Sequence, residues 1–346
     1  MSDHDVALMG HLMRRAGFGC QYQELEARAA KGYEETVEEL LNPSEDTHGM
    51  DLDLAERYFI EWNHHIRCVP EYIAFRMVNS KSQLEEKMIL FWHGILCHTD
   101  SKNQSQIASH AEWEMLRRCG LDSFKDLLIE ISKDPAMVYF LDNCLSHKDA
   151  INENYGRELL ELFSLGVGMD GEFNYTEDDV KECARAFTGW TLANGIPPQP
   201  YGRYTSTFVY NPDDHDDGEK TFLGHTGNFN GEDIIDILCK QPATARFISR
   251  HIYDFFVADE AQVPTWMETP PRDPETIKML EDEYIRSDYN IRSMLRILFN
   301  SDAFKNARFA RIKGPIETVI GTLRLAGDWT TPKPGFEAIF EEMKHM

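Results

Sequence analysis

The sequence predicts a mainly α-helical chain, folded as one large domain over residues 1–346 and interrupted by a small irregular or β-hairpin excursion at about residues 194–231. Three observations predict this class. Apolar residues recur at helical spacing along most of the chain. Stretches rich in β-forming residues are few and short. The sequence contains no Gly-x-Gly-x-x-Gly fingerprint and no alternation of strands and helices, which excludes a nucleotide-binding sheet.

Helix boundaries follow from capping residues and apolar spacing. The first helix is expected to begin at Asp5 and to end at residues 17–19, where two glycines can adopt the left-handed conformation that closes a helix. Ser82 and Glu85 form a capping box that begins a long helix. Further helices are expected at residues 21–41 with a break near Gly32, 52–64, 70–79, 104–118, 153–165, 177–190, 231–239, 242–257, 274–287, 291–300 and 312–327.

The helical pattern is interrupted between Asn194 and about Gly231. This segment is rich in Gly, Pro, Asn and Asp, and it holds a β-prone run from Tyr204 to Tyr210 and a shorter one at residues 221–223. A long excursion of this kind inside a compact helical domain is uncommon and tends to be functional. The segment is therefore the first place to look for a site.

Composition limits the partners. The chain has 59 acidic and 35 basic side chains, a formal charge of -24, which repels phosphate backbones and anionic lipid. We therefore expect no nucleic-acid partner. No run of about 18 apolar residues predicts a membrane span, and the first residues do not resemble a signal peptide. The seven cysteines form no Cys-x-x-Cys pair and are expected to be reduced core residues, so the chain as written is predicted to be cytoplasmic.

A polar stripe lies on the helix expected at residues 153–165. Asn154, Arg157, Glu158 and Glu161 occur at positions i, i+3, i+4 and i+7, with apolar residues on the opposite face. Spacing alone favours a solvated face with weak ion pairs. The alternative is that two carboxylates and a guanidinium line a cleft, as an acid or base beside an anion clamp.

An acidic loop lies inside the excursion. Residues 211–220 hold four aspartates, a histidine and a glutamate around one glycine, a density of oxygen ligands that suits Ca²⁺ or Mg²⁺. The candidate metal ligands are Asp213, His215 and Asp217. The loop is not an EF-hand, because the twelfth position counted from Asp213 is Gly224 rather than a carboxylate. A solvated turn is the alternative.

His93 lies within the apolar stripe of the helix that begins after Ser82. A hydrogen-bonded core histidine is favoured there over a metal ligand or a catalytic base. His98, five residues later, is about 140° away around a regular helix, so the two imidazoles are not expected to chelate one ion.

Several blocks together resemble the bacterial domain-of-unknown-function family 1800, in the family's order from about residue 11 to residue 325. The blocks cover residues 14–19, 91–93, 152–168, 175–190 and 215–224. The resemblance implies a mostly helical fold without a settled activity, and many members look exported. It also implies a possible partner, a phosphatase- or sulfatase-like protein encoded nearby. The residues that match the family pattern are Arg14, Arg15, His93, Asn154, Arg157, Glu158, Glu161, Arg185, Trp190, His215, Asp216 and Lys220.

The sequence departs from the family pattern in three places. Many relatives have a second histidine at the position of Ile95, so a two-histidine site on this helix is not expected. The family's usual C-terminal block, with Pro-Pro and Gly-Trp, is missing after Met346, so the chain is expected to be shortened or to lack a closing element. The exported members' leader is also absent.

Two functions are compatible with these patterns. The first is a helical scaffold or partner-docking protein, favoured because no complete triad, metal motif or phosphate loop is present. The second is a metal-assisted hydrolase or polysaccharide-processing enzyme that uses the loop at 213–220 and the helix face at 154–161. In that enzyme the loop and the helix face would have to lie side by side in the fold. The enzyme's catalytic residues would be Glu158, His215 and Asp216, and its substrate-binding residues Asn154, Arg157, Glu161, Arg185, Trp190 and Lys220.

Overall fold

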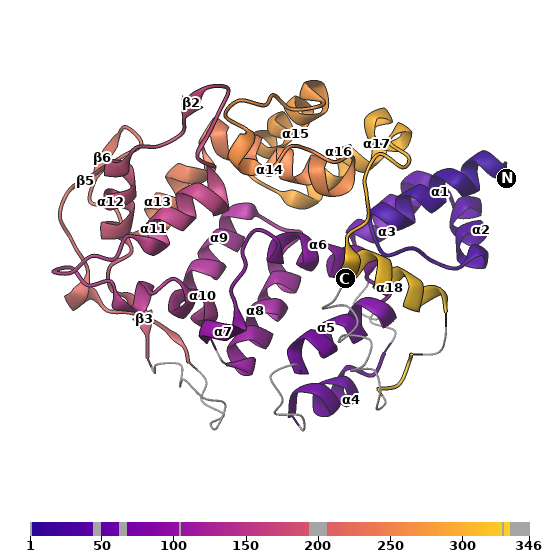
Figure 1. Ribbon diagram of the computed structural model, residues 1–346, viewed down its shortest axis with the longest axis horizontal. Helices are drawn as coiled ribbons and strands as arrows, with labels where there is room; N and C mark the ends of the chain where they lie inside the picture. Colours follow the sequence, from indigo (N-terminus) through magenta and orange to yellow (C-terminus); the bar gives the residue numbers. More distant parts are fainter. Residues whose placement is uncertain are drawn as a thin grey trace. The chain divides into compact units, whose positions relative to one another are not determined.

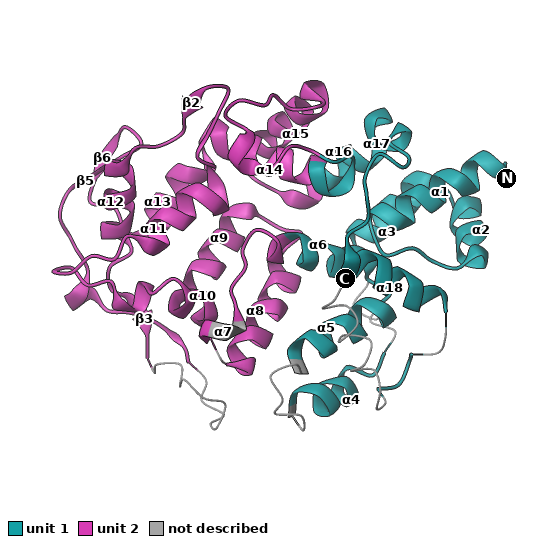
Figure 2. Ribbon diagram, viewed as in Figure 1, with its two compact units in different colours: residues 1–91, 254–259, 294–346 teal, residues 92–253, 260–293 magenta. Residues whose placement is uncertain are grey.

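The computed structural model describes residues 2–43, 50–61, 68–103, 105–193, 206–326 and 329–332. Contacts divide the chain into two compact units, which Figure 2 shows in different colours. Unit 1 contains residues 1–91, 254–259 and 294–346, and unit 2 contains residues 92–253 and 260–293. The division into units does not test the expectation of a single domain over residues 1–346, which stays a prediction.

All the secondary-structure elements described in unit 1 are helices (Figure 1). Its first helix begins at Asp3, two residues before the expected start, because Ser2 caps it: the Ser2 hydroxyl accepts the Asp5 N–H, and the Asp5 carboxylate accepts the Ser2 N–H at 2.8 Å. The elements of unit 1 are α1 (Asp3–Arg15), α2 (Tyr22–Lys31), α3 (Tyr33–Leu41), α4 (Leu52–Glu56), the π-helical η1 (Arg57–Glu61), α5 (Cys68–Asn79), most of α6 (Gln83–His93), the end of α14 (Pro242–Phe256), most of α16 (Ile291–Asn300), α17 (Asp302–Asn306) and α18 (Pro315–Leu325).

Unit 2 contains the helices around both predicted site regions. Two of its helices, α9 (Phe124–Lys133) and α10 (Pro135–Phe140), lie where the apolar spacing predicted none. Each has a side-chain cap, Ser123 for α9 and Asp134 for α10. The other helices are α7 (Asp100–Asn103), α8 (Gln106–Cys119), η2 (Asn143–Leu145), α11 (Asn154–Glu158), the π-helical η3 (Leu159–Ser164), α12 (Glu177–Ala186), η4 (Pro212–Asp214), α13 (Gly231–Cys239), α14 (Pro242–Phe256), η5 (Val263–Thr265), α15 (Pro274–Arg286) and the start of α16 (Ile291–Asn300).

The β structure of unit 2 consists of three small antiparallel pairs. β1 (Gly168–Met169) pairs with β2 (Glu172–Phe173), β3 (Trp190–Leu192) with β4 (Phe208–Tyr210), and β5 (Lys220–Phe222) with β6 (His225–Gly227). The prediction of a mainly helical chain with a small β excursion is confirmed. The first part of that excursion, residues 194–205, lies outside the described residues.

The start of β3 shows why the helix expected at 177–190 ends early. Gly189 has a φ of 77°, and an added Cβ would lie 2.5 Å from the backbone oxygen of Asn211. Only glycine adopts this conformation without strain and allows the loop to approach so closely. The chain therefore leaves α12 at Ala186 and turns into the strand that pairs with β4.

The last turn of the excursion joins β5 to β6. Leu223 and Gly224 both have positive φ values, 47° and 79°, as a two-residue hairpin turn requires. In the part of the chain that the structure describes, no helix is long and apolar enough to cross a membrane.

Candidate functional site

Helix α12 lies between the two regions that the sequence singled out. It contacts α11 and also β5, and Figure 1 shows these elements together in unit 2. Thr176 and Asp179 form the capping box that begins the helix. The Asp179 carboxylate has a second role: one oxygen accepts the Thr176 N–H at 2.9 Å, and the other accepts the Leu223 N–H of the hairpin at 2.7 Å.

Arg185, in the last turn of α12, holds the acidic loop. Its guanidinium donates to both oxygens of Asp216, from Nε at 2.7 Å and from Nη2 at 3.1 Å, and it donates from Nη1 to Glu182 at 2.8 Å. The hydrogen bonds from Arg185 lower the pKa of Asp216 to about 2. A Cβ at Gly218 would lie 2.6 Å from Arg185 Nη2, so a side chain there would have to displace the guanidinium. We call Glu182, Arg185, Asp216 and Lys220 the Arg185 network.

Lys220 completes the Arg185 network from β5. The side chain is 1% exposed, and its ammonium donates to the backbone oxygens of Asp216 and Gly218. Burial lowers the pKa of Lys220. The buried ammonium therefore holds the backbone of the acidic loop through two hydrogen bonds.

His215 is also directed into the protein. Its side chain is 5% exposed, and Nδ1 donates to the backbone oxygen of Thr188 at 2.9 Å. The Thr188 hydroxyl in turn accepts the N–H of Asp216 at 2.8 Å. The remaining loop aspartates lie nearer to solvent. Asp213 and Asp217 are exposed, and Asp214 pairs with His147 at 2.6 Å. Among the described residues, no group of three or more His, Cys, Asp or Glu side chains could hold a metal ion, so the ligand set Asp213, His215 and Asp217 is not assembled.

The polar stripe of α11 contacts the other end of α12, at its first turn. Arg157 forms a two-pronged pair with Glu177, at 2.9 and 2.8 Å, which raises the pKa of Arg157. Glu161, in the π-helical segment η3, accepts a hydrogen bond from the Tyr175 hydroxyl at 3.0 Å. Burial and then the nearby charge of Glu161 raise the pKa of Glu158.

The structure therefore brings together some of the predicted site residues and separates others. Asp216, Arg185 and Lys220 meet in one network, with His215 next to them. Among the described side chains, no hydrogen bond or ion pair joins Arg157 or Glu158 to His215 or Asp216. Asn154 bonds through its backbone N–H to the side chain of Asn152 at 3.0 Å, beside the stripe.

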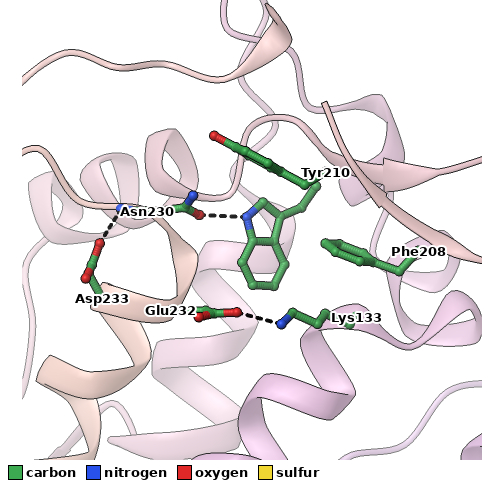
Figure 3. Close-up of a pocket in the computed structure, with 7 residues that line it drawn as sticks. Lys133, Phe208, Tyr210, Asn230, Glu232 and Asp233 are labelled. Atoms are coloured by element: carbon green, nitrogen blue, oxygen red, sulfur yellow. Dashed lines mark hydrogen bonds and ion pairs between the residues drawn. The ribbon is translucent and has the colours of Figure 1, made fainter. Parts of the chain in front are cut away.

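Trp190 lies in a pocket of unit 2 with a volume of about 360 Å³, which Figure 3 shows in close-up. The indole is 3% exposed, and its N–H donates to the side-chain oxygen of Asn230 at 2.8 Å. The Lys133 ammonium pairs with Glu232 at 2.6 Å across the pocket. The pocket is lined by Lys133, Trp190, Phe208, Tyr210, Asn230, Glu232 and Asp233.

A buried cluster that the sequence analysis missed lies around helix α8. His98 Nδ1 is 2.8 Å from a Glu112 oxygen, and His98 Nε2 is 3.0 Å from the Ser109 hydroxyl. Glu112 is fully buried. Asp134 is 6% exposed, and its pKa is raised well above the ordinary value, first by burial and then by the charge of Glu112. We call His93, His98, Ser109, Glu112 and Asp134 the His98 cluster.

The His98 cluster is poor in hydrogen-bond partners. Nδ1 of His93 and Oε1 of Glu112 are both buried without one. His93 packs on the Trp113 ring at 4.3 Å, and burial lowers its pKa to about 4, so the imidazole is neutral at pH 7. Native proteins leave few buried polar atoms unpaired, and such atoms often mark a functional centre.

One signal in the sequence could have identified the cluster. Glu112 shares a helix face with Ala108, Met115 and Leu116, all buried. A carboxylate on an apolar stripe is a buried charge, and buried charges need a partner elsewhere in the fold. The cluster also borders the polar stripe, because Glu112 and Glu158 both raise the pKa of Cys97 after burial does so.

Comparison with known proteins gives one match. A family model described as "Protein of unknown function (DUF1800)" matches residues 11–346. No curated protein and no solved structure matches the chain.

Proposed function

Since the chain belongs to the DUF1800 family of proteins of unknown function, we propose that it is a helical scaffold that docks a partner protein. In this proposal the polar residues of α11, α12 and the loop at 211–220 are internal supports that fix the helices and the hairpin. Paired charges of this kind hold elements in one orientation.

The observation that carries the proposal is the Arg185 network. Arg185 uses three of its nitrogens on Asp216 and Glu182, and the Lys220 ammonium is enclosed by two backbone oxygens. A general acid or base is most effective when its pKa is close to the working pH. Asp216, with a pKa of about 2, stays ionised and paired.

The hydrolase alternative receives less support. It requires an ion at Asp213, His215 and Asp217, yet the two aspartates are exposed and the described residues include no group of three or more such side chains that could hold a metal ion. It also requires Glu158 and Arg157 to face the loop, whereas Arg157 pairs with Glu177 at the start of α12. A polysaccharide-processing role likewise requires the loop at 213–220 to contact the helix face at 154–161.

The partner and the compartment are parts of the same proposal. A phosphatase- or sulfatase-like protein, suggested by the family resemblance, is the first partner to test. The cytoplasm is the compartment we infer, and the support is that the six cysteines with described side chains are all free thiols.

The test is purification of the tagged full chain under gentle conditions, with light scattering for mass and elemental analysis for metal. The proposal expects a stoichiometric complex with one other protein and no bound divalent ion. A lone chain that carries an equimolar divalent ion, lost on His215→Ala substitution, would contradict it and support the hydrolase.

A further inference from the structure

We propose that the pocket beside Trp190 binds a small organic ammonium ion, with a quaternary ammonium head group as its best ligand. The proposal goes beyond the scaffold role and does not depend on it. It rests on three features of unit 2: an aromatic wall, a lysine ammonium that already lies against that wall, and an open space lined by carboxylates.

The aromatic wall is built by the pairing of β3 with β4. Trp190 is opposite Tyr210 and Leu192 is opposite Phe208, and residues two apart in a strand share a face. The side chains of Trp190, Phe208 and Tyr210 therefore lie on one side of the ribbon. The rings of Trp190 and Phe208 are 5.1 Å apart and meet edge to face. Because the indole N–H is bound to Asn230, the orientation of the Trp190 ring is fixed.

A cation already occupies part of this wall. The Lys133 ammonium, at the end of α9, lies 5.5 Å from the centre of the Trp190 ring and 5.9 Å from that of Phe208. Both distances are within the range of about 6 Å for attraction between a cation and an aromatic face. Glu232 supplies the counter-charge at 2.6 Å. The site thus has the chemistry of an ammonium receptor, with a tethered lysine as its present occupant.

Space and charge favour a further cation. The pocket has a volume of about 360 Å³, and Tyr210 and Asp233 line it together with the lysine pair. Tyr210 is 38% exposed, so the wall is open to solvent at this end, whereas Trp190 is buried. The net charge of -24 concentrates cations near the surface and repels anions. A neutral sugar has fewer free hydrogen-bonding groups here, because the Asn230 side-chain oxygen already accepts from Trp190 and Gly231.

The first experiment removes the tethered competitor. Lys133→Met keeps the hydrocarbon stem and deletes the ammonium, which competes at an effective concentration in the millimolar range. We expect choline and tetramethylammonium to bind Lys133→Met about tenfold more tightly than wild type, measured by calorimetry or ligand-observed NMR. Lys125→Met is the matched control, because Lys125 forms the same kind of pair between α9 and α13, with Asp236 at 2.5 Å. Its affinity should equal that of wild type.

The second experiment tests the recognition chemistry in the wild-type background. Tyr210→Leu should weaken choline binding several-fold, whereas Tyr210→Phe, which keeps the ring, should retain it. Both variants change a partly exposed side chain, so they remain informative if Lys133→Met fails to fold. The neutral isostere 3,3-dimethylbutan-1-ol should not bind. Equal binding of this alcohol, binding of glucose in place of choline, equal affinities for the two lysine variants, or no saturable binding in any variant would overturn the proposal.

Discussion

The Arg185 network and the His98 cluster are both assemblies of ionisable side chains in unit 2, but their charges are balanced differently. Asp216 and Glu182 share a guanidinium at hydrogen-bond distance and are partly buried. Glu112 and Asp134 are buried, and their described hydrogen bonds and ion pairs include no lysine or arginine. Burial costs an ionised group its hydration, which close opposite charges and hydrogen bonds offset. The carboxylates of the network are therefore paired with a permanent cation, whereas those of the cluster have only a histidine and backbone N–H groups beside them.

Removal of the shared cation should give the largest effect. Arg185→Gln leaves Asp216 and Glu182 as neighbouring like charges with limited access to water, so we expect a loss of about 2–3 kcal/mol in the free energy of unfolding. Urea unfolding of the purified chain measures it. The matched control is Arg118→Gln, which breaks an exposed pair with Glu130 at 2.7 Å and should cost less than about 1 kcal/mol. If both variants lost the same free energy of unfolding, the Arg185 network would stabilise the fold no more than an exposed ion pair does.

Acid should weaken the network through Asp216. The folded pKa of about 2 is lower than the model value of 3.8. The ionised pair therefore contributes stability above the unfolded pKa, and this contribution is lost as the pH falls towards 2. We expect a loss of about 2 kcal/mol between pH 5 and pH 2 that Asp216→Asn lacks. Parallel pH profiles for the two proteins would assign the acid sensitivity to other groups.

In the cluster, removal of a charge should have the opposite sign. Asp134 has a raised pKa, so the folded state holds its proton more tightly than the unfolded state, and stability falls as the pH rises through the folded pKa. Asp134→Asn keeps an oxygen that can accept the N–H groups of Ala136 and Met137. We expect this variant to be about 1–2 kcal/mol more stable than wild type at pH 7, by thermal or urea unfolding. A destabilised variant would show that the charge of Asp134 is compensated in the folded state.

The smallest effect should come from Ser109, the hydroxyl-bearing member of the cluster. Ser109→Ala removes the hydroxyl beside His98 Nε2 and should cost about 1 kcal/mol in the free energy of unfolding. Thr226→Val, which deletes an exposed hydroxyl paired with Thr221 at 3.1 Å, is the control and should change stability by less than about 0.5 kcal/mol. If the two variants lost equal stability, burial would not distinguish the cluster's hydrogen bonds from those at the surface.

Sequence patterns predicted those parts of the fold that depend on local signals. The helices expected at residues 231–239 and 291–300 have the same bounds in the structure, since a cap or an apolar stripe defines each one. The helix expected at 153–165 is divided into α11 and the π-helical η3, where the Ser164 hydroxyl donates to the Leu159 backbone oxygen. The strand β3 was missed because its partner β4 lies 18 residues away, counted between Trp190 and Phe208. Such pairing is not a local property.

The contacts of the candidate site were also not predictable, because they too depend on residues far apart in the sequence. The sequence identified the charged residues of α11 and of the loop, but it could not tell that the first turn of α12 pairs Glu177 with Arg157 and the last turn pairs Arg185 with Asp216. Side chains eight positions apart on one helix are separated by about 12 Å along its axis, so they contact different neighbours. The His98 cluster was missed for another reason. Glu112 and Asp134 come from separate helices, and only the tertiary fold brings their charges together.

Asp179 links the first turn of α12 to the β5–β6 hairpin, because its two oxygens accept the N–H groups of Thr176 and Leu223. Because one carboxylate holds both the first turn of the helix and the hairpin, we expect the two elements to unfold locally together. The amide hydrogens of Thr176 and Leu223 should then exchange with deuterated solvent at matching rates, as members of one local unfolding unit.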